Sequence, residues 1–350
     1  MWRVFRSPVV WIGLAISVGA LFLAFRGLHW QEVGDALADA NLGLLVLGVL
    51  LVVVTIVTRA IRWRVLFYPK LDTGFGNRLG ALNVGYSVNN MLPARLGEVV
   101  RAYAIRETEG VSLAHALSTI LVERILDTLT VISLLMITLP FIDAPGWARW
   151  PAFFLGLGFL TLATLLAGLS AAREGALRIV ESLSRLLPER FRQPLVQFAD
   201  AAIEGFGTLR NPWVLGQALA WSAVSWVASA VFMYVMLRAF GIDEPFTAGL
   251  FVTAAVTLAM IVPASPGHIG VFHAIAIESL EDIFGVDRND AASFALVAHA
   301  ITYVVPMVLA AGYLWRERKT WRRVRLWLTQ REGEEDSSGA PALETETAER

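Results

Sequence analysis

The sequence predicts an all-α polytopic membrane protein with about six full transmembrane helices and two oppositely oriented re-entrant helical hairpins, arranged as an inverted repeat. Of its 350 residues, 56% are hydrophobic and 17% are charged, whereas soluble domains are usually ~45–50% apolar and ~25% charged. The apolar residues form long runs, and two of these runs stop early at a proline, one in each half of the chain. These observations together predict the fold class.

Six runs are long enough to cross the membrane, which takes roughly 20 apolar residues. The first run follows two arginines, so a cleaved signal peptide is the alternative interpretation there, although no convincing small-x-small site precedes Arg26. The six runs are residues 7–25, 42–58, 113–139, 152–170, 212–237 and 290–314.

The distribution of arginine predicts the orientation, because cytoplasmic loops are rich in Lys and Arg. The loops after the second and fourth full spans and the segment after the last span are arginine-rich, whereas the loops at 26–41, 140–151 and 238–246 hold one arginine each. The pattern is consistent only if each hairpin returns to its own side, the first from the cytoplasm and the second from outside. We therefore expect a multi-pass protein of the cell (cytoplasmic) membrane with both termini cytoplasmic.

The two interrupted segments cover about residues 79–110 and 247–286. The first breaks at Pro93-Ala94-Arg95 and the second at Pro263-Ala264-Ser265-Pro266-Gly267. Paired, proline-interrupted segments in corresponding halves point to a binding site near the bilayer midplane. The sequence therefore predicts a site for a polar-headed ligand between the two hairpins.

Polar residues around the first break are candidates for binding the substrate. Charges at membrane depth cost about 2.5–3.5 kcal/mol each on insertion scales, so they usually face a partner or a wet cavity. Two arginines beside a helix start can hold a phosphate through forked donors. The alternative is an interfacial arginine cluster that follows the positive-inside rule. The candidates are Asn89, Asn90, Arg95, Glu98 and Arg101, together with Arg59 and Arg62 at the end of the second span.

The second break has the composition of a helix start. Ser265 is a good N-cap and Pro266 a good first helical residue. Gly267 and Gly270 leave the backbone bare, with His268 between them. Free N–H groups and the positive end of the helix dipole favour an anion such as a lipid phosphate. The alternative interpretation is a structural kink.

The run from Ser112 carries a polar stripe at i, i+4 spacing, comprising His115, Thr119, Glu123 and Asp127, with Arg124 beside it. We expect both carboxylates to lie inside the bilayer, where they either pair with Arg59, Arg62 or Arg95 or carry a proton. Structural ion pairing is the commoner explanation of such a stripe.

Histidines add one further candidate for charge balancing or proton carrying, His273. The spacing of His268 and His273 does not match the i, i+4 pattern of a metal-binding helix, so a zinc site with His299 is the weaker alternative. No metal and no cofactor are expected.

The remaining segments suggest one transmembrane domain over residues 1–328. Apolar residues at helical spacing in 173–210 predict amphipathic helices on the cytoplasmic leaflet, or else a soluble hairpin packed on the bundle. Residues 329–350 are acidic and almost free of large apolar residues, which predicts a disordered tail.

Three motifs carry a family resemblance: NNMLPARLGEVVRAY at Asn89–Tyr103, ALSTILVERILD at Ala116–Asp127 and PASPGHIGVFHAI at Pro263–Ile275. With RAIRWRVL at Arg59–Leu66, they resemble the membrane region of bacterial lysylphosphatidylglycerol synthases, a wide flippase-like family that includes stand-alone proteins. The resemblance covers residues 5–320.

The resemblance implies a flippase-like fold and substrates such as aminoacylated phospholipids or polyprenyl-linked sugars. This chain departs from the family at His268 and His273, where the family often has glycine and glutamate. A proton-coupling role carried over from the family to that site is therefore in doubt. The family's aminoacyl-transfer domain is also missing, and the chain is not expected to make the lipid. The residues that match the family motifs are Arg95, Glu98, Arg101, Glu123, Arg124, Asp127, Pro266, Gly267 and Gly270.

We expect a flippase or scramblase for an anionic or glycosylated lipid, phospho- or polyprenyl-linked, and not an enzyme. One alternative is an intramembrane enzyme that modifies a lipid headgroup, with Glu123 and Asp127 as acid and base. The other is a non-catalytic membrane partner of a lipid-modifying transferase. The sequence has no phosphate-loop motif for ATP hydrolysis and no cysteine, and no nucleic-acid partner is expected.

Overall fold

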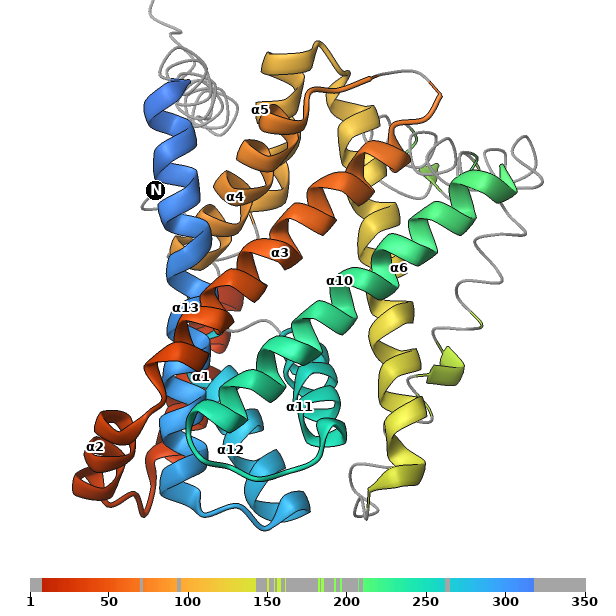
Figure 1. Ribbon diagram of the computed structural model, residues 1–350. Helices are drawn as coiled ribbons and strands as arrows, with labels where there is room; N and C mark the ends of the chain where they lie inside the picture. The colour runs from red at the N-terminus through yellow and green to blue at the C-terminus, as the bar shows by residue number, and fades with distance from the viewer. Residues whose placement is uncertain are drawn as a thin grey trace, which may run out of the picture.

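The computed structural model describes residues 8–69, 72–92, 96–142, 210–261 and 265–317, with isolated positions between 150 and 207. All regular structure in these ranges is helical (Figure 1), which confirms the predicted all-α class. The predicted span at 152–170 lies almost entirely outside the described residues. So do most of the 173–210 segment, the acidic tail and Arg95, and the predictions made for them stand as predictions.

Five of the six predicted spans are helices. Within the described ranges, three helices are long and apolar enough to cross a membrane, or four if the bent pair α1–α2 counts as one span. α6 has 26 residues and would extend about 39 Å, but three charged residues interrupt its apolar sequence. The five helices are α1 (Pro8–Phe25), α3 (Leu42–Leu66), α6 (Leu113–Thr138), α10 (Pro212–Ala239) and α13 (Arg288–Arg316).

Each interrupted segment forms a pair of short helices that pack against each other. The first pair is α4 (Phe75–Met91) and α5 (Gly97–Glu109); the second is α11 (Phe246–Ala259) and α12 (Val271–Phe284), with the 3₁₀ turn η3 (Pro266–His268) between them. The two pairs occupy opposite ends of the molecule, and their turns lie toward its middle (Figure 1).

Close backbone approach makes the first hairpin possible. A Cβ atom on Gly97 would lie 1.9 Å from the carbonyl oxygen of Gly85, so any side chain at position 97 would force α4 and α5 apart.

The two halves of the chain repeat one pattern. α3–α4–α5–α6 and α10–α11–α12–α13 each run long, short, short, long. α3 packs along α10, α4 packs on α13, and α11 packs on α6. Exchanging the two halves turns the α4–α13 contact into the α11–α6 contact and leaves α3–α10 unchanged, as a two-fold arrangement requires. The two hairpins therefore enter from opposite ends, and their turns lie at a similar level.

The N-terminal region differs from the expectation. Residues 26–41 were expected to be a loop, but they contain α2 (Trp30–Asp39), and the α1 and α2 axes are bent by 82°. Asn289 fixes α2 to α13: its side-chain oxygen accepts from the His29 N–H at 3.0 Å, and its amide donates to Glu32 at 2.6 Å.

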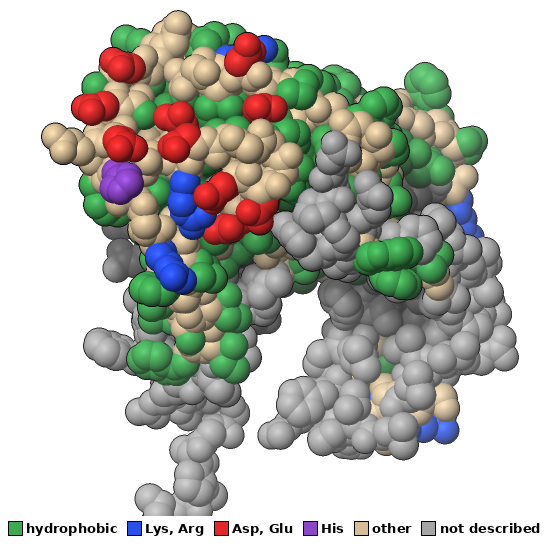
Figure 2. All heavy atoms as spheres, turned by 90° about the horizontal axis from the view of Figure 1, so that it is seen from below, with side chains coloured by type: hydrophobic (Ala, Val, Ile, Leu, Met, Phe, Trp, Pro, Cys, Tyr) green, Lys and Arg blue, Asp and Glu red, His purple; other side chains and the backbone are tan. Residues whose placement is uncertain are grey.

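The two ends of the bundle differ in charge. Figure 2 shows the end that carries α2 and the α12–α13 turn, where acidic side chains outnumber basic ones. The opposite end holds Arg64, Arg106 and Arg316, at the C-terminal ends of α3, α5 and α13. Acidic residues of the first end include Glu32, Asp35, Asp39, Glu278, Glu281, Asp282, Asp287 and Asp290.

Candidate functional site

A network of buried charges lies inside the bundle, centred on Glu123 of α6, which is fully buried. Arg101 of α5 donates to both of its carboxylate oxygens, at 3.0 and 2.7 Å. Arg124 donates to it at 2.7 Å, and Arg62 of α3 lies at 3.4 Å. Three guanidinium groups therefore surround one carboxylate, and the cost of burying these charges is offset by their mutual attraction.

Asp127, one turn along α6, extends the network to the second half of the chain. It accepts hydrogen bonds from the fully buried Arg62 and from the indole N–H of Trp226 on α10 at 3.0 Å. Arg62 also donates to the hydroxyl of Ser222 on α10 at 3.0 Å. The network thus ties α3, α5, α6 and α10 together.

Aromatic rings hold two of the arginines. The guanidinium carbon of Arg101 lies 3.7 Å from the centroid of the Trp63 ring, and the Trp63 indole donates to Thr119 at 2.9 Å. Arg59 lies over the Trp226 ring at 4.9 Å and donates to the Tyr86 hydroxyl at 3.2 Å. Such contacts favour a cation where water is scarce.

Glu123 and Asp127 form ion pairs with Arg62, one of the two predicted partners that the structure describes. Arg101, a candidate for binding the substrate, is buried at 2% exposure, with its guanidinium on Glu123. Glu98 lies within electrostatic range of Arg124. His115, at the start of the polar stripe, lies beside the Phe67 ring, with the ring centroids 5.9 Å apart.

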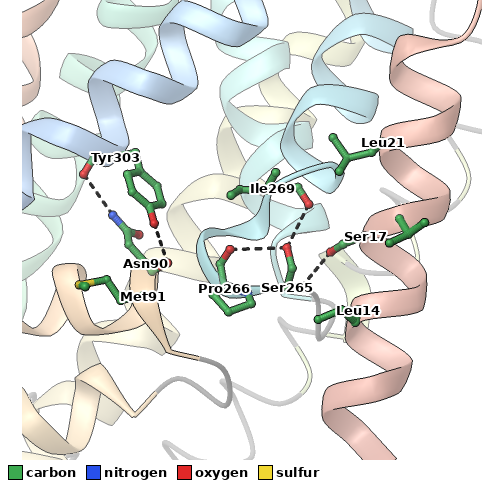
Figure 3. Close-up of a pocket in the computed structure, with 10 residues that line it drawn as sticks. Leu14, Ser17, Leu21, Asn90, Met91, Ser265, Pro266, Ile269 and Tyr303 are labelled. Carbon is green, nitrogen blue, oxygen red and sulfur yellow. Dashed lines mark hydrogen bonds between the residues drawn. The ribbon is translucent and has the colours of Figure 1, made fainter. Parts of the chain in front are cut away.

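The tips of the two hairpins meet in the middle of the molecule. The Asn90 amide donates to the Tyr303 carbonyl at 3.2 Å, and the Tyr303 hydroxyl donates to the Asn90 carbonyl at 2.9 Å (Figure 3). A Cβ atom on Gly267 would lie 2.5 Å from the Tyr303 ring. Asn89 accepts from the Gly97 N–H at 2.8 Å, which closes the first tip.

The helix start predicted at Ser265 is wrong. Gly267 and His268 have φ of 68° and 54°, which limits the structure after Ser265 to one 3₁₀ turn, and α12 begins at Val271 after Gly270. Ser265 does not cap a helix. Its N–H donates to Ser17 of α1 at 2.8 Å instead.

His273 of α12 and His299 of α13 are buried against aromatic rings near the second tip. The His273 ring accepts from the Gly270 N–H at 3.3 Å and lies 4.8 Å from the His299 ring, centroid to centroid. A ring nitrogen of His299 contacts the Gly267 carbonyl at 3.0 Å. Among the residues that the structure describes, no group of three or more His, Cys, Asp or Glu could hold a metal ion.

A cavity of about 520 Å³ lies between α1, the two hairpin tips and α13 (Figure 3). Hydroxyl and amide groups line part of it and apolar side chains line the rest, and none of the lining residues that the structure describes is charged. The lining residues are Leu14, Ser17, Val18, Leu21, Asn90, Met91, Ser265, Pro266, Ile269 and Tyr303.

Sequence reasoning missed several of these residues. Ser17, Ser222, Trp226 and Tyr303 lie in apolar runs as single polar or aromatic residues, and their importance depends on neighbours far along the chain. The spacing of His299 and Tyr303, one turn apart in an apolar run, is the signal that could have identified the last helix as part of the site.

Comparison with known proteins identifies a family and several relatives that this chain resembles. A family model for the lysylphosphatidylglycerol synthase TM region matches residues 10–310. Glycosyltransferase AglD of Haloferax volcanii is 26% identical over 89% of this chain and 54% of its own length, so the chain spans about half of that relative.

Relatives of similar length also match. A UPF0104 membrane protein of Methanothermobacter thermautotrophicus is 26% identical over 87% of both chains. A UPF0104 membrane protein of Methanocaldococcus jannaschii is 20% identical over 89% of this chain and 94% of its own length.

Proposed function

This chain belongs to the family of the lysylphosphatidylglycerol synthase transmembrane region, and on that premise we propose that it is a flippase or scramblase that moves an anionic or glycosylated lipid across the cell membrane. The lipid would be phospho- or polyprenyl-linked. Its headgroup would pass between the two hairpin tips while its chains stay in the bilayer.

One observation carries this proposal: two hairpins from opposite ends of a two-fold arrangement meet at Asn90, Gly267 and Tyr303. Polar backbone at the level where two repeats meet is typical of transporter binding sites. The uncharged cavity beside the tips is bounded by α1, whose large apolar side chains are exposed. A lipid could therefore reach the tips from the membrane side.

The charge difference between the two ends supports an orientation. The end with Arg64, Arg106 and Arg316 would face the cytoplasm, and the acidic end in Figure 2 would face outside. In this orientation the first hairpin enters from the cytoplasm, the second enters from outside, and both termini are cytoplasmic.

The carboxylates favour transport over catalysis. An acid–base pair needs groups that can exchange protons with a substrate, but Glu123 and Asp127 are both buried and held by guanidinium groups. The name of the AglD relative describes a protein about twice as long as the matched region. A role as the membrane partner of a lipid-modifying transferase is thus the second candidate.

A substitution at the second tip tests the proposal. Gly267→Ala places a Cβ atom against the Tyr303 ring at a φ of 68° and should distort the meeting point of the tips. Gly312→Ala is the matched control. Gly312 lies on α13, the same helix as Tyr303, and a Cβ atom added there would have no neighbouring atom within 4 Å. Both variants and the parent chain are reconstituted in liposomes, and inward movement of a headgroup-labelled phosphatidylglycerol is followed by quenching.

We expect the parent and Gly312→Ala to move the labelled lipid and Gly267→Ala to fall to the rate of protein-free liposomes. Equal rates in all three proteins would refute passage between the tips. If the purified parent moves neither this lipid nor a polyprenyl phosphate, and a transferase co-purifies with it in fixed ratio, the partner role is correct.

A further inference from the structure

The buried network contains one arginine that has no carboxylate partner among the described residues. Arg62, Arg101 and Arg124 each form ion pairs with Glu123 or Asp127. Arg59 contacts the Tyr86 hydroxyl and two aromatic rings instead. The described part of the network thus holds four guanidinium groups against Glu98, Glu123 and Asp127.

Hydrogen-bond donors in the network are also left over. The Nε atoms of all four arginines of the network are buried and have no hydrogen-bond partner, and neither has one terminal nitrogen of Arg62. A buried donor without a partner is costly, and a charged one more so. Arg62 and Arg101 are buried and form ion pairs with Glu123 or Asp127, so these two arginines serve the protein itself. Arg59 and Arg124 are partly exposed, so a ligand can approach them.

The surroundings of Arg59 leave its edge available. Trp226 covers the guanidinium from one element and Tyr86 from another, at 4.9 and 6.0 Å from the ring centroids. Rings hold a guanidinium by its face, whereas its N–H groups project from the edge as a planar fork that matches phosphate oxygens. Arg59 is only partly buried, unlike Arg62 and Arg101, so a ligand can approach its side chain.

Arg59 also lies close to the meeting point of the tips. Tyr86 and Asn90 are four residues apart on α4, so they share a face about one turn, or 5.4 Å, apart. Asn90 lines the cavity and holds Tyr303. A phosphate bound at Arg59 would leave the rest of its headgroup within reach of the hydroxyl and amide groups there.

We propose that Arg59 binds the phosphate ester of a membrane lipid, with Arg124 as its neighbour, and that Arg62 and Arg101 only position the network. This inference rests on the proposed function, since it names the group on the transported lipid that is recognised. The bound phosphate supplies Arg59 with a direct ion pair, which it forms with no carboxylate among the described residues.

The test measures binding of dioleoyl phosphatidic acid to the purified full chain in detergent by native mass spectrometry. Dioleoylglycerol, which has the same chains and no phosphate, is the matched ligand. The variants are Arg59→Gln, Arg59→Lys and, as the control, Arg64→Gln. Arg64 lies five residues further on α3, exposed, and pairs with Asp72, so its loss removes the same charge outside the network.

We expect the parent and Arg64→Gln to bind phosphatidic acid at least about tenfold more tightly than dioleoylglycerol, and Arg59→Gln to lose this preference. Arg59→Lys keeps the charge but not the fork and should keep part of the preference. If Arg59→Gln does not purify as a monodisperse protein, the lipid preference of Arg59→Lys is compared with that of the parent instead. An unchanged preference in either Arg59 variant would overturn the proposal.

Competition with inorganic phosphate distinguishes a lipid phosphate from free phosphate as the ligand. Millimolar phosphate should compete only weakly with phosphatidic acid, because it lacks the chains. If it protects the parent against thermal unfolding as well as the lipid does, and Arg59→Gln abolishes that protection, the ligand is free phosphate and the lipid assignment fails. If phosphatidic acid binds in an Arg59-dependent manner but the chain moves no lipid, the transport function is refuted and this inference stands. If the chain moves lipid but binds dioleoylglycerol as tightly as phosphatidic acid, this inference is refuted and the transport function stands.

Discussion

The hydroxyl of Tyr303 donates to the carbonyl of Asn90 at 2.9 Å, and the side chain of Asn90 donates back to the carbonyl of Tyr303 at 3.2 Å. This reciprocal pair joins the tip of the first hairpin to the last described helix. Gly267, at the tip of the second hairpin, lies directly beside the same tyrosine ring. A headgroup that passes between the tips must therefore pass or open this pair.

Removing the Tyr303 hydroxyl should weaken the junction between the two halves. Tyr303→Phe loses one hydrogen bond, worth about 0.5–1.5 kcal/mol net, and leaves the Asn90 carbonyl without that donor. We expect a lower thermal unfolding temperature in detergent. Tyr234→Phe is the control, since it loses only the exposed contact with Arg238, and should unfold at the parent temperature. Equal temperatures for both variants would show that the pair contributes nothing.

Removing the central carboxylate should be far more damaging. Glu123→Gln leaves Arg62 and Arg101 buried without their full counter-charge, and breaking a buried pair costs about 3–5 kcal/mol. Glu278→Gln, in a partly exposed pair with Arg288, should cost at most about 1 kcal/mol. Thermal unfolding of the two variants measures the difference, and a loss for Glu123→Gln no larger than that for Glu278→Gln would contradict it.

A double variant of Arg101 and Glu123 separates the attraction between the two charges from the cost of removing them from water. Replacing both Arg101 and Glu123 by methionine removes the buried charges together, so it should be less destabilising than Glu123→Gln. Arg62 keeps Asp127 as its partner in this variant. A double variant less stable than the single one would mean that packing, and not charge balance, determines the cost.

The proposed orientation predicts which engineered cysteines are accessible from outside the cell. The chain contains no cysteine, so single-cysteine variants give no background. Asp35→Cys and Asp243→Cys should react with a membrane-impermeant maleimide in intact cells, because both residues are exposed at the acidic end. Arg64→Cys and Arg316→Cys should react only after the membrane is opened. The reverse pattern would invert the topology, and labelling of both ends from outside would refute it.

Much of the architecture could be predicted because it depends on local composition. Apolar runs indicated α1, α3, α6, α10 and α13, and the proline breaks indicated the two short-helix pairs. Helix α2 was missed because it has only ten residues, with acidic residues among the apolar ones, and because it is held by distant contacts such as that of Glu32 with Asn289. The helix start at Ser265 was mispredicted because backbone conformation at Gly267 and His268 overrides a favourable capping sequence.

Hydropathy and helical spacing alone predict the class of protein, the positions of its apolar helices and the polar stripe of α6, since both signals act over a few turns of one segment. The ion pair of Glu123 with Arg101, the hydrogen bonds of Asp127 with Arg62 and Trp226, and the contact of Arg59 with Tyr86 could be recognised only in the folded chain. These pairings depend on the packing of α3, α4, α5, α6 and α10. The physical reason is that a buried charge takes the partner that folding brings within a few ångströms, whatever the distance along the chain.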